Sequence, residues 1–489
     1  MSERLIGEVR SLLDLADRTC SDPDTAAALA RIRARLDGPL RVAFAGKVKA
    51  GKSTLLNALV GEQLAPTDAG ECTRIVSWYQ NGLGYGVTIH PLAGAPVPTP
   101  FSRADGGLSI DLAGRDPADI DRLVIDWPSS TLAEMTLIDT PGIASLSEDI
   151  SERAMRFLAP DDERETDADA VIYLMRHLHA SDHRFLEAFH DQSASQPSPV
   201  NTIGILSRAD EIGVGRVDAM VSASKIAARY RADPSIRRLC QTVLPVAGLI
   251  AEAAATLRED EYRALRTLAD APVEEAEALL LSVDRFAQTP EAFGLIPMDR
   301  EHLLGRFGLF GLRLSVALIR AGQADTAGAL AAQLSLHSGV DHLRALLDTV
   351  FRQRRSVLKA RVALLALHSI VVRTPEAQGQ LADELERVLA NAHEIAELRL
   401  LNHLRSASLG FDDALADRME RVVGSLGTTP QARLGLHADT GIDEVRARAV
   451  ATMQEWRTQM EHPLTTRHQK EALEIAVGSV ERIFVELAH

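Results

Sequence analysis

The first half of the chain alternates between short apolar runs and helical stretches. Runs of this kind, several of which end at Gly or Asp, are typical of buried parallel strands. The expected strands are Leu40–Ala45, Ile75–Trp78, Met135–Ile138, Ala170–Met175, Thr202–Leu206 and Thr242–Val246. Because helices separate several of these strands, the pattern predicts an α/β domain with a mostly parallel sheet.

Three more strand-like segments lie between Gly82 and Trp127, where turns rich in Pro and Gly separate them. These segments are Gly86–His90, Leu108–Leu112 and Leu123–Ile125. We expect them to form an antiparallel extension at one edge of the sheet.

From about residue 250 onward the hydrophobic pattern is helical. Residues 338–341 match a capping box, and two rows of apolar residues recur every seven positions after it. The rows are Leu343, Val350, Val357, Leu364 and Val371, and Phe351, Leu358, Leu365 and Val372. They predict one helix of roughly 34 residues, about 50 Å long, that ends at Thr374-Pro375. A second helix is expected through Leu381–Ile395, a loop at Gly424–Gly441, and a last helical region with an apolar stripe from Ala472 to Leu487.

Two helices, Ser2–Ala16 and Ala26–Leu36, are expected before the first strand. This order predicts three parts: N-terminal neck helices at 1–37, an α/β domain at 38–325, and helices at 326–489. The N-terminal and C-terminal segments together would form an elongated all-α bundle.

Composition limits the possible classes of protein. The 489 residues leave room for two or three domains. A net charge of −15 argues against nucleic acid as the main partner, because phosphate backbones attract clustered Lys and Arg. Cys20, Cys72 and Cys240 lie far apart, which indicates a reduced, cytoplasmic protein. No apolar stretch approaches the ~20 residues of a membrane span, so only peripheral membrane contact stays open.

The motif that carries chemistry follows the first strand. Residues 46–54 read GKVKAGKST, which matches GxxxxGK[ST] between a strand and a helix. Backbone N–H groups of such a loop surround a β-phosphate. Lys52 is expected to bridge the β- and γ-phosphates, and Ser53 to ligate Mg²⁺. The remaining nucleotide contacts are expected from Lys49, Ala50, Gly51 and Thr54. The chain has six lysines, and three of them lie in this loop.

Two further segments are expected to complete the phosphate and metal site. Asp139-Thr140-Pro141-Gly142 follows a strand, so that Asp139 would hold the Mg²⁺ hydration shell and the N–H of Gly142 would sense the γ-phosphate. Thr73, beside Arg74, is expected to close over the γ-phosphate and to ligate Mg²⁺. Residue 143 is Ile, where a Ras-like enzyme has its water-orienting Gln, so hydrolysis must be organised in another way.

A base-reading loop is expected at Ser207-Arg208-Ala209-Asp210, after a strand. The Asp210 carboxylate would accept hydrogen bonds from guanine N1–H and its amino group, and the stem of Arg208 would lie over the ring. Ser207 and Arg208 depart from the usual Asn or Thr and Lys. Val246-Ala247-Gly248 is expected to supply a backbone donor to guanine O6. An ATPase survives as an alternative only if Asp210 does not read the base.

Three charged clusters have two interpretations each. The histidines after the fourth predicted strand are a zinc site or, as we expect, ordinary surface residues: His177, His179, His183 and His190. The acidic run Asp161–Asp169 is expected to be a solvated loop rather than a calcium site. Arg352, Arg354, Arg355 and Lys359 contact anionic lipid or, as we expect, form a solvated helix face.

With these motifs in place, the chain resembles the dynamin superfamily of large GTPases. It is most similar to the isoniazid-inducible dynamin-like proteins of mycobacteria, in particular their shorter C-type member. The Thr73-Arg74 pair and the apolar residue after DTPG are typical of the superfamily. The resemblance implies a dynamin-type GTPase domain at 38–325 between neck and trunk helices, cytoplasmic and acting at the inner face of the plasma membrane. It also implies nucleotide-dependent self-association or pairing with a paralogous subunit.

The resemblance also bears on catalysis. Many dynamins have a catalytic serine at the position of Lys49, and a related family has an arginine there. We therefore hypothesise that Lys49 is a cation that stabilises the transition state from within the same chain.

Two functions stay open: a mechanochemical GTPase that loads a membrane, and a GTP-controlled switch that binds a partner without remodelling membranes. A GTPase associated with RNA is disfavoured, because the C-terminal part is helical and not basic. Candidate membrane tips are Leu409-Gly410-Phe411, Leu434-Gly435-Leu436 and the turn at Thr374-Pro375. Each of them is otherwise a buried turn between helices.

Overall fold

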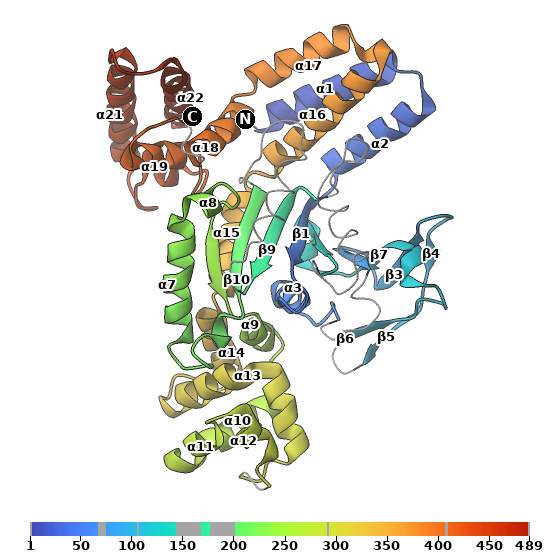
Figure 1. Cartoon of the computed structure of the whole chain (residues 1–489), viewed down its shortest axis with the longest axis vertical. Helices are drawn as coiled ribbons and strands as arrows, with labels where there is room; N and C mark the ends of the chain where they lie inside the picture. Colours follow the sequence, from blue (N-terminus) through green and yellow to red (C-terminus); the bar gives the residue numbers. More distant parts are fainter. Residues whose placement is uncertain are drawn as a thin grey trace.

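The computed structural model describes residues 2–66, 75–104, 107–142, 168–176, 201–290, 293–405 and 409–487. In the described chain an α/β domain lies between helices at both ends of a long molecule (Figure 1). The predicted combination of an α/β domain and a large helical part is therefore confirmed.

A nine-stranded sheet forms the centre of the described α/β domain, with the strand order β11-β10-β9-β1-β8-β2-β7-β3-β4. The strands are β1 Leu40–Gly46, β2 Val76–Gln80, β3 Gly86–Pro91, β4 Val97–Pro98, β7 Ile120–Asp126, β8 Met135–Asp139, β9 Ala170–Met175, β10 Thr202–Ser207 and β11 Val243–Val246. The five strands from β11 to β8 are parallel, and Val42 of β1 lies between Leu137 of β8 and Ala170 of β9. Every residue of β9 and β10 is buried, as expected for strands covered on both faces.

The predicted antiparallel extension is only partly correct. β3 pairs antiparallel with β7 and β4, but β7 runs parallel to β2, which is itself antiparallel to β8. The segment expected at Leu108–Leu112 leaves the main sheet, because β6 (Gly107–Ile110) pairs with β5 (Phe101–Ala104). Pro98 ends β4 and Pro100 lies between β4 and β5, and Pro has no N–H with which to continue a ladder.

Helices surround the sheet and form three groups. The first covers the sheet: α3 Lys52–Val60, α4 Ser130–Glu134, α7 Ala219–Ala232, α8 Pro234–Arg237, α9 Gly248–Ala255 and α15 Val340–Leu347. α14 Ala327–Ser338 packs on α9 and, through Leu330 and Leu334, on the second group. A side lobe at the lower end of Figure 1 comprises α10 Glu259–Asp270, α11 Val273–Leu279, α12 Val283–Gln288 and α13 Pro297–Arg320. Its core includes Phe286, Phe307 and Leu312.

The third group lies at the upper end of the molecule in Figure 1 and has two lobes. The neck lobe comprises α1 Ser2–Thr19, α2 Pro23–Asp37, α16 Arg355–Arg373 and α17 Gln380–Asn391. The C-terminal lobe comprises α18 His393–Arg405, α19 Asp413–Val422, α20 Pro430–Leu434, α21 Ile442–Glu461 and α22 Arg467–Glu486. One connected apolar core runs through both lobes and includes Leu12, Leu364 and Trp456.

The single long helix predicted after residue 338 does not form. Gly339 has a left-handed φ of 79°, α15 ends at Leu347, a π-helical turn covers Asp348–Arg352, and α16 starts at Arg355. The sevenfold apolar pattern continues across this break because its two halves pack on different partners. Phe351 belongs to the core of the sheet, whereas Leu364 belongs to the core of the neck lobe. The second expected helix is likewise divided, into α17 and α18, and α20 lies within the expected loop.

Packing also bears on where the helical part begins. Leu330 and Leu334 of α14 pack with the side lobe, and Val340 and Leu343 of α15 pack with the sheet. Most of α16 instead packs with the neck lobe, from Val357 onward. We therefore propose a boundary near residue 355 in place of 326.

One described helix, α13, is long and apolar enough by composition to cross a membrane. Half of its most apolar window is buried within the fold, and Gly308, with φ 61° and ψ 174°, breaks the helix in its middle. These features are typical of a core helix, which is how α13 packs in the side lobe.

Candidate nucleotide-binding site

The phosphate-binding loop lies at the carboxyl end of β1, and its backbone requires glycine at two points. Gly46 has φ 145°, and a Cβ there would lie 2.4 Å from the Leu174 carbonyl oxygen. Gly51 has φ 91° and starts α3. The exposed Lys49 also has a positive φ of 61°, so the loop holds a non-glycine residue in a costly conformation.

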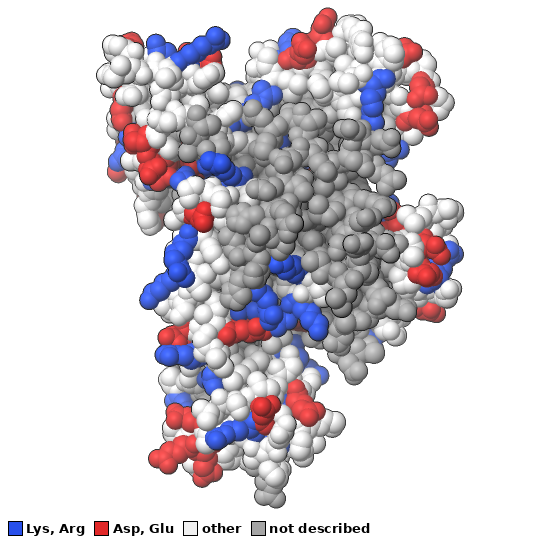
Figure 2. All heavy atoms as spheres, viewed as in Figure 1, with Lys and Arg blue, Asp and Glu red and all other residues white. Residues whose placement is uncertain are grey.

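Lys52 is the buried cation of this loop, with 8% of its surface exposed. Its Nζ donates to the carbonyl oxygens of Gly46 at 3.3 Å and Lys47 at 3.4 Å. Burial lowers the pKa of the ammonium, and the charge of Asp139 only partly opposes this effect. A buried ammonium held mainly by carbonyl dipoles would be stabilised by an arriving anion. Figure 2 shows Lys and Arg side chains gathered over α3 and α9, in the middle of the molecule.

Ser53 and Asp139 are brought together as predicted. Ser53 Oγ donates to Asp139 Oδ2 at 2.6 Å, and Asp139 Oδ1 is buried without a hydrogen-bond partner among the described residues. Burial raises the pKa of Asp139, against the effects of Lys52 and Ser53. A hydroxyl and a carboxylate with an unsatisfied oxygen are hard oxygen ligands, so these residues fit Mg²⁺.

The DTPG segment is fixed against the phosphate-binding loop. Thr140 Oγ1 donates to the Phe44 carbonyl oxygen at 2.7 Å. A Cβ at Gly142 would lie 2.4 Å from Val48 Cγ2 and 2.7 Å from Val48 Cα. Only glycine fits this approach, so residue 142 lies directly beside the loop.

The base-reading loop contacts the phosphate-binding loop through Arg208. This residue has φ 51°, and its Nε donates to the Lys49 carbonyl oxygen at 3.1 Å. Asp210 is buried, and burial raises the pKa of its carboxyl group. Ser207 Oγ is buried and has no partner in the described part of the chain. A buried carboxylate beside a buried hydroxyl that has no hydrogen-bond partner is suited to a polar ligand such as a purine edge.

The structure reduces the number of candidates for the backbone donor expected at Val246-Ala247-Gly248. The N–H of Ala247 donates to the Ser338 carbonyl oxygen at 2.9 Å, and Val246 is a buried residue of β11. A Cβ at Gly248 would lie 3.8 Å from Thr54 Cγ2, so Gly248 faces the start of α3. Of the three residues, Gly248 is the best candidate for a free backbone donor.

The side lobe borders this site, a contact that the hydrophobic pattern did not predict. A Cβ at Gly308 of α13 would lie 3.9 Å from Asp210 Oδ2, and a Cβ at Gly215 would lie 3.4 Å from the amide nitrogen of Phe310. Arg313 donates to the carbonyl oxygens of Val214 and Gly215, which follow Asp210 in the chain. The glycines that interrupt the apolar run of α13 were the available signal.

Several expected residues lie outside the described part of the chain. They are Thr73, Arg74, Cys72, Ile143, residues 161–167 and the four histidines 177, 179, 183 and 190. Their expected roles stay predictions.

Three expectations about charged residues were wrong. Asp169, assigned to a solvated acidic run, is buried, and its Oδ1 accepts from Arg35 of α2 at 2.8 Å. Arg354 and Lys359, assigned to a solvated or lipid-binding face, are also buried. Arg354 donates to the carbonyl oxygens of Val423 and Gly424, and Lys359 to those of Leu36 and Gly38. Burial makes ionisation costly and lowers the pKa of Lys359 to about 8.

The two candidate membrane tips of the C-terminal lobe pack inward. Leu434 is buried in the shared core of the upper lobes, and Leu409, Phe411 and Leu436 are partly buried against that core. They are therefore turns between helices in this structure.

The fold and the site define a GTPase with a phosphate-binding loop. Residues 41–203 match the family model described as a 50S ribosome-binding GTPase. The chain is 42% identical over 461 residues to the isoniazid-induced protein IniC of Mycobacterium tuberculosis, covering 94% of this chain and 93% of IniC. It is 32% identical over 117 residues to a bacterial dynamin-like protein of Nostoc punctiforme, covering 22% of this chain and 17% of that protein. The chain therefore belongs to the family of IniC, among the bacterial dynamin-like GTPases.

Similarity to solved structures is low. The whole chain aligns with 74% of a protein from an oligomerised bacterial dynamin pair, described as a mechanism for long-range sensing and tethering of membranes, with 13% identity and a TM-score of 0.31. A likeness this low places no constraint on this chain.

Proposed function

We propose that the chain binds GTP with Mg²⁺ at this site and hydrolyses it to GDP and phosphate. The observation that supports the proposal best is the meeting of five residues at the ends of β1 and β8: buried Lys52, the Ser53–Asp139 pair, and Gly142 against Val48. Lys52 would neutralise charge on the β- and γ-phosphates, and the Gly142 N–H would contact the γ-phosphate. Ser53 and Asp139 would hold the Mg²⁺, which supplies positive charge to the leaving diphosphate.

Specificity for guanine would come from Asp210 and Arg208. Asp210 lies in a buried position that disfavours an unpaired charge, so two N–H donors of the base would stabilise its carboxylate. The Arg208 side chain is held between the Lys49 carbonyl oxygen and Glu211. Displacing labelled GTP with GDP, but not with ATP, would support this assignment.

Lys49 is proposed as the cation that replaces an arginine finger, with Lys52, Thr73 and Gly142 as the other catalytic residues. The Lys49 side chain is exposed at the tip of the loop, beside the base-reading loop. We expect Lys49→Ala to retain GTP affinity and to lower turnover at least about a hundredfold, since such cations contribute 10³–10⁵ in related enzymes. Full turnover in that variant would exclude the role.

Two controls separate charge from backbone. Lys49→Gly also removes the ammonium but relieves the positive φ, and it should be equally inactive if the charge matters. Lys47→Ala removes a neighbouring lysine and should leave turnover within about twofold. If the single variant Lys47→Ala were also inactive, the cause would be a general loss of positive electrostatic potential at the loop and not a specific role of Lys49.

We further propose that GTP-dependent association of the α/β domains, with a second copy or a paralogous subunit, moves the neck and C-terminal lobes at the inner face of the plasma membrane. The Arg35–Asp169 pair supports such coupling, because it joins α2 of the neck lobe to the start of β9. Turnover per molecule should rise with protein concentration if association completes the site. A flat profile would oppose this part of the proposal and leave GTP binding intact.

A second candidate is a GTP-controlled switch that binds a partner without remodelling membranes. It is favoured by the packing of Leu434, Leu436 and Phe411 against the core and by the burial of Arg354 and Lys359, which leaves Arg352, Arg355 and the turn at Thr374-Pro375 as the described candidates for lipid contact. Co-sedimentation with liposomes, with and without a GTP analogue, separates the two functions.

A further inference from the structure

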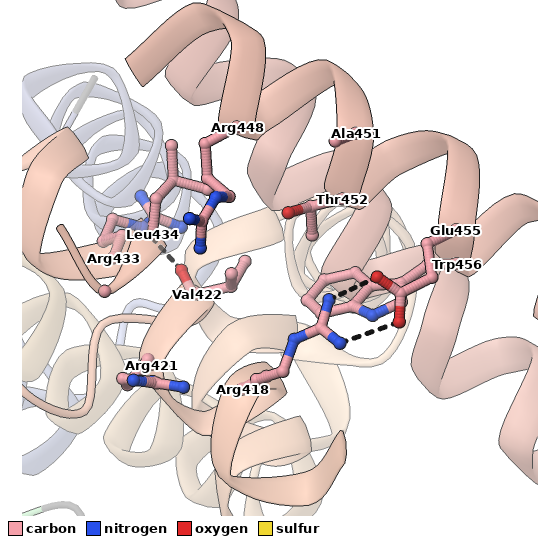
Figure 3. Close-up of a pocket in the computed structure, with 11 residues that line it drawn as sticks. Arg418, Arg421, Val422, Arg433, Leu434, Arg448, Ala451, Thr452, Glu455 and Trp456 are labelled. Carbon is pink, nitrogen blue, oxygen red and sulfur yellow. Dashed lines mark hydrogen bonds and ion pairs between the residues drawn. The ribbon is translucent and has the colours of Figure 1, made fainter. Parts of the chain in front are cut away.

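A cavity of about 440 Å³ lies in the C-terminal lobe, far in sequence from the nucleotide site. It lies between α19, α20 and α21 and is open to solvent on one side, and its walls carry four arginines and one carboxylate: Arg418, Arg421, Arg433, Arg448 and Glu455. Figure 3 shows Arg421 and Arg448 on the left of the cavity and the Arg418–Glu455 pair on the right. Its volume is within the roughly 300–1,000 Å³ of small-molecule sites.

Two of the four arginines are already neutralised. Arg418 makes a bidentate pair with Glu455 at 2.7 and 2.6 Å, which raises the pKa of Arg418 and lowers that of Glu455. Arg433 is buried, and it donates to Glu397 and to the Val422 carbonyl oxygen. These pairs fix the walls of the cavity and leave its charge to the other two arginines.

Arg421 and Arg448 are paired with no carboxylate among the described residues. The Arg421 guanidinium lies over the backbone of Gly435, where a Cβ would be 2.9 Å from Nη1. Trp456 also lines the cavity, and its buried indole N–H has no partner in the described chain. In a chain with a net charge of −15, two unpaired guanidinium groups facing one cavity are a local excess of positive charge.

We propose that this cavity binds a phosphate-bearing anion, either a small soluble phosphate compound or the headgroup of an anionic phospholipid. Planar guanidinium groups donate two parallel hydrogen bonds to a phosphate, and Arg421 and Arg448 would approach it from two helices. The Thr452 hydroxyl, which Figure 3 shows turned toward the cavity, adds a third donor. The cavity suits a single headgroup better than a protein surface, because its volume of about 440 Å³ is that of a small-molecule site.

Isothermal titration calorimetry with pyrophosphate on the full chain tests the proposal, with excess GDP and Mg²⁺ present to occupy the phosphate-binding loop. The variant Arg421→Gln/Arg448→Gln should weaken pyrophosphate binding at least about tenfold, since each lost charge-assisted contact is strong. The affinity of Arg421→Lys/Arg448→Lys for pyrophosphate should lie between those of the unchanged protein and the Gln variant, because lysine keeps the charge but not the bidentate geometry. Thermal unfolding of each variant verifies that it is folded.

A matched control removes two positive charges from the same lobe outside the cavity. Arg457→Gln/Arg467→Gln changes exposed residues of α21 and α22 that pair with Glu481 and Glu471. It should bind pyrophosphate like the unchanged protein. Equal binding by the Arg421/Arg448 variant and the unchanged protein would overturn the proposal.

Vesicles distinguish the two sources of phosphate. Binding to vesicles of phosphatidylglycerol and phosphatidylcholine, absent with phosphatidylcholine alone and lost with Arg421→Gln/Arg448→Gln, would identify a lipid headgroup. Pyrophosphate binding that depends on both arginines, without such vesicle binding, would identify a soluble ligand. Absence of both pyrophosphate and vesicle binding would exclude the site. None of these outcomes depends on whether the chain hydrolyses GTP.

Discussion

The nucleotide site and the arginine cavity both concentrate positive charge in an acidic protein, but they are built in opposite ways. The nucleotide site depends on the backbone. Gly46 and Gly51 have positive φ, a Cβ at Gly46 or Gly142 would clash with neighbouring atoms, and backbone carbonyl oxygens hold Lys52. The arginine cavity depends on side chains from three helices, held by Glu397 and Glu455. The first should therefore be sensitive to single methyl groups and the second to single charges.

The largest effect should follow from adding one methyl group at Gly142. In Gly142→Ala the new Cβ would meet both Cγ2 and backbone atoms of Val48 within 2.8 Å, so the DTPG segment must move away from the loop. We expect GTP turnover to fall about a thousandfold, or about 4 kcal/mol in activation free energy. Single-turnover kinetics measure this.

Two variants control for that result. Adding Val48→Ala should not restore activity, because the clash with the Val48 backbone remains. Gly305→Ala adds the same methyl group where no atom lies within 4 Å and should be neutral. Restoration by Val48→Ala would show that side chains, not backbone, shape the nucleotide site.

A smaller effect is expected in the C-terminal lobe from removing Arg433. Arg433→Met leaves the buried carboxylate of Glu397 without its main charge partner, which should cost about 3 kcal/mol of folding free energy. Adding Glu397→Gln should recover part of this loss. Urea unfolding followed by fluorescence gives the free energies.

An exposed ion pair provides the comparison for Arg433. Arg457→Met breaks the surface pair with Glu481 and should cost less than about 1 kcal/mol. Equal losses of unfolding free energy in Arg457→Met and Arg433→Met would mean that the buried Arg433–Glu397 pair stabilises the lobe no more than an exposed pair does.

These two sites also show what a sequence can and cannot predict. Lys52, Ser53, Asp139 and Asp210 were predictable because each stands at a fixed offset from the end of a strand, and parallel strands bring those ends together. The arginines of the cavity had no such signal. Arg421, Arg433 and Arg448 are separated by a turn, a short helix and a loop, and only the packing of α19, α20 and α21 makes them neighbours.

The helices teach the same lesson. The sevenfold apolar rows correctly identified Val350, Val357 and Leu364 as buried, but Val372, at the end of the second row, is 61% exposed. They did not predict the break at Arg354, because periodicity reports which face is buried and not which partner covers it. The break lies where the Arg354 side chain donates to a carbonyl oxygen of the C-terminal lobe, a contact that the sequence pattern does not report.

The last predicted effect concerns pH and distinguishes the two regions by the sign of their response. Burial would raise the pKa of Glu397, but the nearby His393 side chain, a hydrogen bond from Ser479 and the charge of Arg433 outweigh it and hold the pKa at about 2. Its stabilising contribution is complete above an unfolded pKa of about 4.5 and is lost as pH falls from there toward 2. The full loss of this contribution corresponds to roughly 3 kcal/mol of folding free energy at most.

Asp139 in the nucleotide site has a raised pKa, so its protonation in acid stabilises the folded state rather than destabilising it. Hydrogen exchange at pH 5 and pH 3 should therefore show protection lost first in α18 and α22, with β1 and β8 losing less, and Glu397→Gln should remove most of that difference. Equal loss in both regions would contradict the opposite construction of the two sites.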